Sequence, residues 1–215
     1  MKRFLSVMII ALLVLGGAFA GTSNMAPSAT KPGTEVKSTV DVGLDVELSA
    51  MTSYAFGFSN TVGSETDLGS SDLTKLPTPF SGTLALNYDA ARGIGTTEAV
   101  GGNAKDIWMY CKIQAKDAVT LEINAGQMTD QNGAPAIDMT VTATQGYTFG
   151  SGNKTESFTA TSSPSTNGTI TITPSAQAIE LNAISYKLKV ETSKLPVLSQ
   201  AAKYTGTITV NVAGA

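Results

Sequence analysis

The stretch Lys203-Tyr-Thr-Gly-Thr-Ile-Thr-Val-Asn-Val-Ala-Gly-Ala215, at the end of the chain, alternates apolar and polar side chains. Successive side chains of a β-strand point to opposite faces. In a strand, the apolar residues Tyr204, Ile208, Val210 and Val212 therefore share one face, and hydroxyl and amide side chains share the other. Such strict alternation predicts a half-buried β-strand.

A second alternation lies near the other end of the chain, between residues 38 and 50. Its apolar members share one face and its acidic members share the opposite face, which discourages pairing with a foreign strand. The pattern predicts a strand. The apolar positions are Val40, Val42, Leu44, Val46 and Leu48, and the opposite positions are Asp41, Gly43, Asp45 and Glu47.

The stretches between these two ends also have the character of strands. Short segments rich in Thr, Val and Ile alternate with turns rich in Gly, Pro and Asn, and helical periodicity is missing from the pattern. About nine or ten strands at this spacing predict an all-β fold, an immunoglobulin-like (Ig-like) two-sheet β-sandwich. We expect one hairpin from residues 107–115 and 119–125, a second from 137–149 and 157–163, and a further strand over 80–90.

The first residues indicate the compartment. Lys2 and Arg3 precede an apolar run from Phe4 to Leu15, and the small residues Ala18 and Ala20 follow. This order is typical of a secretory signal peptide, residues 1–20, cleaved after Ala20. A retained membrane anchor is the alternative, but the apolar run is short for a span of about 20 residues. Residues 21–37 then form a flexible leader, and residues 38–215 a single domain. We expect a secreted protein, in the periplasm or at the cell surface, without a membrane span in the mature chain.

Composition argues against several functions. The chain has no histidine, which excludes Ser–His and Cys–His nucleophiles and zinc sites that contain histidine. The net charge is −3 and no basic run follows Arg3, so nucleic acid is not an expected partner. Cys111 is the only cysteine, so no disulfide forms within the chain, and its apolar neighbours predict a small buried side chain. A reactive thiol is the alternative at this position.

Acidic residues give no clear site. Asp130, Asn132 and Asp138 begin like a calcium loop, but position twelve of that loop is Val141 instead of an acid. A plain turn is the better interpretation. The 17 acidic residues offer many pairs for hydrolytic chemistry, and the sequence singles out none of them. We therefore expect a protein that is not an enzyme and needs no cofactor or metal.

One aromatic pair is a candidate binding feature. Trp108 and Tyr110 share a strand face, and an exposed pair of this kind can stack on a sugar ring. The alternative, which we favour from the sequence, places Trp108 at the centre of the sandwich, as in other Ig-like folds.

Two segments of the chain follow a common plan. Residues 75–88 and 194–212 each contain Lys-Leu-Pro, a spacer, an aromatic residue, Gly-Thr and then alternating apolar residues that end at Asn87 or Asn211. Two explanations are equally good. The similarity is a coincidence among strands rich in threonine, or the two segments occupy equivalent edges of two packed sheets.

The terminal motif also suggests a family. Tyr204, Gly206, Ile208, Val210 and Val212 match the aromatic-x-Gly-x-apolar final strand, and the chain resembles bacterial fimbrial subunits and related secreted sandwiches of the spore-coat type. The resemblance implies an Ig-like fold and assembly by donation of a strand from a neighbouring subunit. The segment from Val40 to Leu48 is then either the donated strand or the first strand of its own domain.

These observations predict a secreted structural or adhesive surface protein, such as a fimbria-like subunit or surface-layer component, with other protein subunits as partners. The alternative is a β-sandwich module that binds carbohydrate or protein without catalysis.

Overall fold

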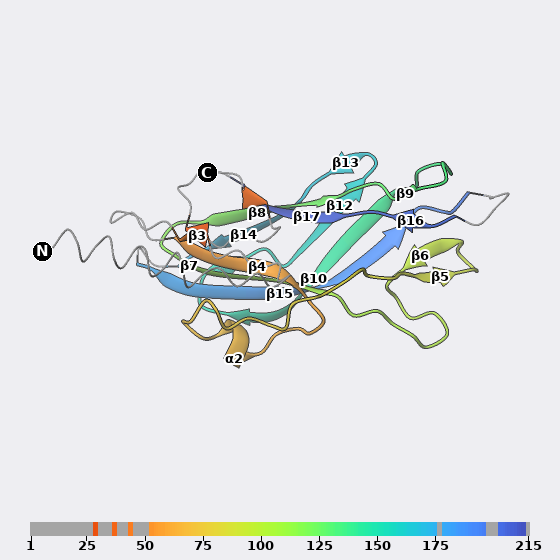
Figure 1. The fold of residues 1–215 in the computed structure, drawn as a ribbon. Helices are drawn as coiled ribbons and strands as arrows, with labels where there is room; N and C mark the ends of the chain where they lie inside the picture. Colours follow the sequence, from red (N-terminus) through yellow and green to blue (C-terminus); the bar gives the residue numbers. More distant parts are fainter. Residues whose placement is uncertain are drawn as a thin grey trace, which may run out of the picture.

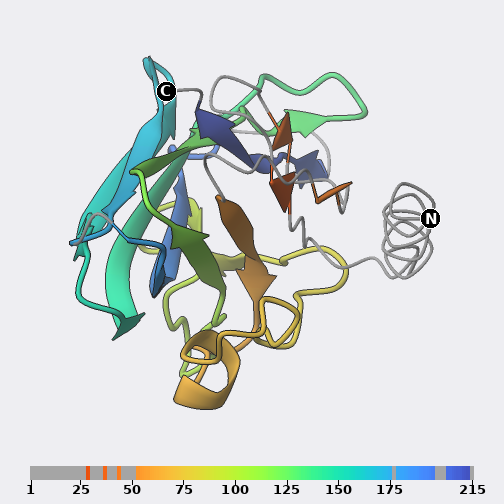
Figure 2. The same cartoon turned by 90° about the vertical axis from the view of Figure 1, so that its left-hand side faces the viewer.

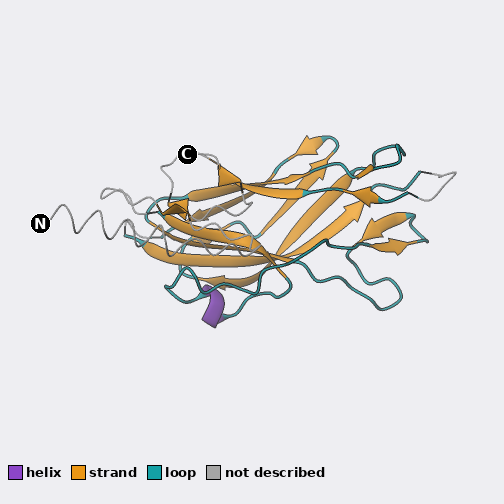
Figure 3. Ribbon diagram, viewed as in Figure 1, coloured by secondary structure: helices purple, strands orange, loops and turns teal. Residues whose placement is uncertain are grey.

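The computed structural model of the chain describes residues 52–175, 178–196 and 202–213, and the backbone of three two-residue strands before them. These strands are β1 (Ser28–Ala29), β2 (Val36–Lys37) and β3 (Gly43–Leu44). Strands make up most of the described chain, and α2 (Glu65–Leu68) is a single helical turn (Figures 1 and 3). The prediction of an all-β fold is confirmed. The predicted signal peptide lies outside the described residues.

The larger sheet is organised around β15 (Glu180–Thr192), a strand of 13 residues. One side of β15 pairs with β10, and the other side pairs with β7 and, further along, with β6; all these ladders are antiparallel. β12 and β13 extend the sheet beyond β10, β4 pairs with β7, and β5 pairs with β6. The bounds are β4 Ser53–Ser59, β5 Asn87–Asp89, β6 Ile94–Thr96, β7 Trp108–Ala115, β10 Met139–Phe149, β12 Ser157–Ser162 and β13 Ser165–Thr166.

The smaller sheet has the order β11-β14-β8-β17-β2, again with antiparallel pairing. Its strands are β11 (Asn153–Lys154), β14 (Gly168–Thr173), β8 (Val119–Ala125) and β17 (Ile208–Ala213). Two short pairs stand apart from both sheets. β1 pairs with β3, and β9 (Thr129–Asp130) pairs with β16 (Tyr204–Thr205).

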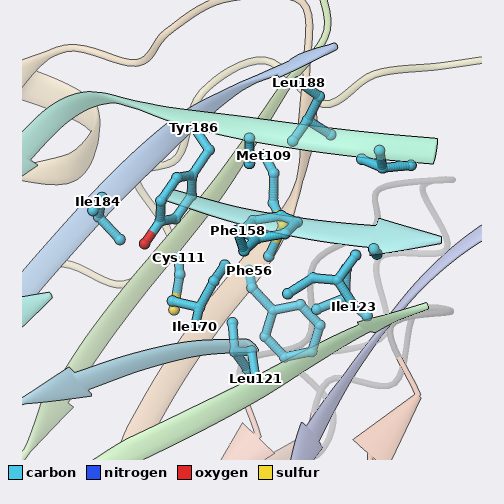
Figure 4. Packing of buried hydrophobic residues seen from close by; sticks show 14 of the residues in the cluster. Phe56, Met109, Cys111, Leu121, Ile123, Phe158, Ile170, Ile184, Tyr186 and Leu188 are labelled. Atoms are coloured by element: carbon cyan, nitrogen blue, oxygen red, sulfur yellow. The ribbon is translucent and has the colours of Figure 1, made fainter. Parts of the chain in front are cut away.

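The core lies between the two sheets. Side chains at alternate positions of β4, β7, β10, β12 and β15 meet those of β8, β14 and β17 in one apolar cluster. Figure 4 shows Phe56 from the larger sheet close to Leu121 from the smaller one, with Met109 beside Phe158 in the same cluster. The period of two in the sequence therefore marks the buried face of most strands, and burial of this apolar surface is the main source of stability.

One predicted hairpin is wrong and the other is confirmed. Residues 107–115 and 119–125 form β7 and β8, which belong to different sheets, so residues 116–118 carry the chain from one sheet to the other. A short polar link fits either connection, and the sequence between the strands does not distinguish them. β10 and β12 do pair antiparallel, with Thr140 opposite Thr161 and Thr144 opposite Ser157.

The strand expected over residues 80–90 is also shorter than predicted. Only Asn87–Asp89 is a strand, while Phe80 is held by the hydrogen bond that its backbone N–H donates to the carbonyl of Phe58, at 2.8 Å. The glycine-rich stretch that follows contains the short strand β6. Alternation over residues 80–86 thus reflects side chains that are half-buried beside the sheet without a ladder of their own.

Cys111 faces the core between the sheets, as the sequence suggested, and its side chain has no exposed surface. Burial raises the pKa of its thiol to about 12. Because the thiolate is the reactive form, we expect no alkylation of the folded protein by iodoacetamide at mildly alkaline pH, and complete alkylation in denaturant. Mass spectrometry after a timed exposure measures both. Alkylation of the folded protein at the rate of free cysteine would contradict the buried position.

Candidate functional site

The terminal stretch divides into two pieces in the structure. Tyr204 lies in β16, opposite Asp130 of β9, and the chain leaves this pair at Gly206 before β17 begins at Ile208. Within β17, Val210 and Val212 are buried in the core and Ile208 is half-buried. Sequence alternation therefore identified the inward face correctly, but not the break before the strand.

Along one edge of β17, few backbone groups pair with a strand that the structure describes. The backbone N–H of Gly126 donates to the carbonyl of Thr207, at 2.9 Å. In an antiparallel ladder, residues that bond to one neighbour alternate with residues whose backbone groups point away from it. The backbone groups of Ile208, Val210 and Val212 therefore point away from β8.

β2 covers only part of this open edge. Val36 lies opposite Val212, and Lys37 lies opposite Asn211. Among the residues that the structure describes, none pairs with Ile208 or Val210 on this side. Unpaired backbone groups at a sheet edge are a template for another strand.

An apolar groove of about 360 Å³ lies beside this edge. One wall is the start of β17 with Gly206, and the other is the irregular segment 80–86. The two segments with the common Lys-Leu-Pro plan thus face each other across the groove. Its apolar lining includes Phe58, Phe80, Leu84, Leu86, Met128 and Ile208.

The remaining predicted assembly positions are only partly placed. Leu44 lies in β3, which pairs with β1. Val40, Val42, Val46 and Leu48 lie outside the described residues. Among the described residues, the structure thus gives a partly unpaired edge and the groove beside it, while the role of the alternating segment stays a prediction.

The two aromatic residues have separate environments. Met109 and Cys111 of β7 face the core, so Trp108 and Tyr110 point to the outer face of the larger sheet. The favoured placement of Trp108 at the centre between the sheets is therefore wrong. Tyr110 is 1% exposed and packs with Leu68 of α2, so it offers no ring face to a ligand. Trp108 keeps part of its surface exposed.

Tyr110 is buried because the segment 60–79 covers this part of the outer face, with α2 outside the sheet (Figures 1 and 2). Burial raises the pKa of Tyr110 above its usual range. Its hydroxyl is buried and has no hydrogen-bond partner among the described residues. The aromatic ring thus serves as an apolar contact for the covering segment.

A buried lysine anchors that segment. Lys112 of β7 has no exposed surface, and its Nζ donates to the backbone carbonyls of Asp67, Asp72 and Lys75, at 2.8, 2.8 and 3.0 Å. Burial lowers the pKa of Lys112, while the carboxylates of Asp72 and Asp67 act in the opposite direction. A charged group without water needs such partners, and these three acceptors tie residues 67–75 of the covering segment to the sheet. Sequence reasoning missed Lys112, although a lysine within the apolar run Ile107–Ala115 was a visible signal.

The suspected calcium loop is a turn. The carboxylate of Asp130 accepts hydrogen bonds from the backbone N–H groups of Lys203, Asn132 and Ala134, at 2.7, 2.9 and 3.3 Å. Desolvation opposes ionisation of this carboxyl, but the backbone donors prevail and lower its pKa. Over the described ranges, no group of three or more Cys, Asp or Glu side chains is arranged to hold a metal ion.

Comparisons with known proteins do not identify a family. No protein-family model, curated protein or solved structure matches the chain. Within the part of the chain that the structure describes, no helix is both long and apolar enough to cross a bilayer.

The lysine anchor leads to a test of stability. Replacement Lys112→Met keeps the length of the side chain but leaves three buried carbonyls without their donor. Because unsatisfied buried polar groups are costly, we expect the free energy of unfolding to fall by roughly 2–4 kcal/mol. Urea denaturation followed by circular dichroism measures the change. The control Lys116→Met alters an exposed lysine just beyond β7 and should change stability by less than about 0.5 kcal/mol. Equal stability of the two variants would refute the anchoring role.

Proposed function

We propose that this protein is a secreted structural subunit, an Ig-like two-sheet sandwich that joins neighbouring copies of itself by strand pairing at the open edge of β17. The observation that carries the proposal is the conjunction of this edge with the apolar groove beside it. Export by the signal peptide, residues 1–20, would bring the subunit to the periplasm or the cell surface.

Strand addition fits the chemistry of this edge. Backbone hydrogen bonds give an added strand its affinity, and pockets for every second side chain give it specificity. An alternating segment such as Val40 to Leu48 can direct its apolar side chains into the groove and its acidic side chains to solvent. After Lys203 the terminal strand carries no charged side chain that would oppose such pairing.

The register of β2 supports this choice of segment. Val36 opposite Val212 and Lys37 opposite Asn211 define an antiparallel ladder. Continued by the same register, the ladder would bring Ser38 opposite Val210 and Val40 opposite Ile208. In an assembly, the segment of a neighbouring copy would make these contacts, so that each chain supplies one strand and receives one.

The test measures the mass of the mature protein, from residue 21, by size-exclusion chromatography with light scattering at several concentrations. We expect oligomers whose share grows with concentration. Ile208→Lys places a charge at the wall of the groove and should leave a monomer, because burial of an unpaired charge is strongly unfavourable. The control Thr169→Lys puts the same charge on an exposed position of β14 and should assemble like the parent.

Deletion of residues 38–48 provides a second test of the same proposal. The shortened protein should stay monomeric at concentrations at which the parent assembles, and an added synthetic peptide of these residues should bind to it. A parent protein that is monomeric at every concentration, or a deleted protein that still assembles, would overturn the proposal.

A further inference from the structure

A cleft lies on the outer face of the larger sheet, away from the β17 edge. β6 and β7 lie one after the other along β15, and the residues between them leave the sheet as a loop. Both ends of this loop are fixed, since Thr97 N–H donates to the carbonyl of Val190, at 3.0 Å, and Leu188 N–H donates to the carbonyl of Ile107, at 2.9 Å. The loop and the outer face of β15 and β10 enclose about 540 Å³, within the range of small-molecule sites.

Trp108 lines this cleft in a fixed position. A Cβ atom on Gly146 of β10 would lie only 2.6 Å from Cζ3 of the indole and 3.1 Å from the Oγ of Ser185. The indole therefore reaches across β15 to position 146, where any side chain larger than that of glycine would collide with it. The β10 ladder changes register at this point, between Gln145 and Thr148. Packing thus holds a partly exposed aromatic ring in place before any ligand arrives.

Charged groups beside the ring are paired with one another. Nζ of Lys187 lies 2.8 Å from a carboxylate oxygen of Asp106 and 5.8 Å from the centroid of the indole ring. Nζ of Lys189 lies 3.2 Å from a carboxylate oxygen of Glu98. Lys187 and Asp106 are each 55% exposed, so they have donors and acceptors left for a ligand. Lys105 also lines the cleft and takes part in none of the ion pairs found among the described residues, so the lining carries one positive charge beyond its pairs.

The opposite wall adds neutral polar groups. Thr144 and Gln145 of β10 are exposed at the cleft and supply a hydroxyl and an amide. The cleft therefore combines one flat apolar surface with hydroxyl, amide, ammonium and carboxylate groups.

From this combination we propose that the cleft around Trp108 binds a neutral saccharide. A gluco-configured pyranose ring has an apolar face of C–H groups, which stacks on an indole, and hydroxyls at its rim, which bond to paired charged and amide groups. This site is separate from the β17 edge, so the subunit would carry a glycan-binding face whether or not it assembles.

The sequence offers a direct reporter, because Trp108 is its only tryptophan. Cellotetraose and chitotetraose, titrated separately into the mature protein, should produce a saturable change in tryptophan fluorescence with at least one of them. Trp108→Ala should abolish the heat of binding in calorimetry. Gln145→Ala should weaken binding roughly three- to tenfold, the loss of one hydrogen bond.

Matched controls separate a site from general surface effects. Tyr88→Ala removes a different aromatic ring, 59% exposed on β5 and outside the cleft, and should bind sugar like the parent. Ile208→Lys should also bind sugar normally, so loss of assembly and loss of binding remain distinguishable. The proposal is overturned if neither sugar gives a saturable change, or if a correctly folded Trp108→Ala variant keeps the heat of binding.

Discussion

The fold depends on burial of β7 on both of its faces. Its inner side chains, such as Met109 and Cys111, fill the core between the sheets. Its outer side chains, among them Tyr110 and Lys112, would face water if the segment 60–79 did not cover them. Contact with Leu68 holds the cover at one point, and the three carbonyls around the ammonium of Lys112 hold it at others. The apolar contacts are not directional, whereas the ammonium of Lys112 requires its three acceptors at defined positions. The lysine therefore determines the position of segment 60–79 on the sheet.

The cover has local order of its own. Ser64 and Asp67 form a capping box, in which the N–H of Asp67 donates to Oγ of Ser64, at 3.3 Å, and the N–H of Ser64 donates to Oδ2 of Asp67, at 3.1 Å. One helical turn is too short to persist alone. Its cap and the burial of Leu68 against the sheet together explain why it forms in a segment of mostly polar side chains.

The limits of sequence reasoning follow from the range of each interaction. Alternation reports which side chains face the core, and it located β7, β8, β10 and the inward residues of β17 because burial acts residue by residue. Pairing partners are decided by distant residues, so the proposed hairpin of β7 with β8 was wrong. The side to which Trp108 points was also wrong, because periodicity separates two faces without telling which of them meets the second sheet. The role of Lys112 was missed because its acceptors are backbone carbonyls, and the side-chain identities of residues 67, 72 and 75 do not reveal them.

The outer face of the larger sheet is divided at Trp108. On one side lies the covering segment. Val62, near its start, lies beside the same indole, since a Cβ atom added to Gly146 would be 3.0 Å from its Cγ2. On the other side lies the open cleft bounded by Lys187 and Asp106. Because the covered half already satisfies its buried lysine and its apolar side chains, it has little left to offer a ligand. The uncovered half keeps an aromatic surface and solvent-exposed ion pairs, which an incoming polar ligand can use without opening the core. The sheet is thus rigid where segment 60–79 lies on it, and it carries the proposed saccharide site where that segment ends, apart from the β17 edge that we propose for contacts between subunits.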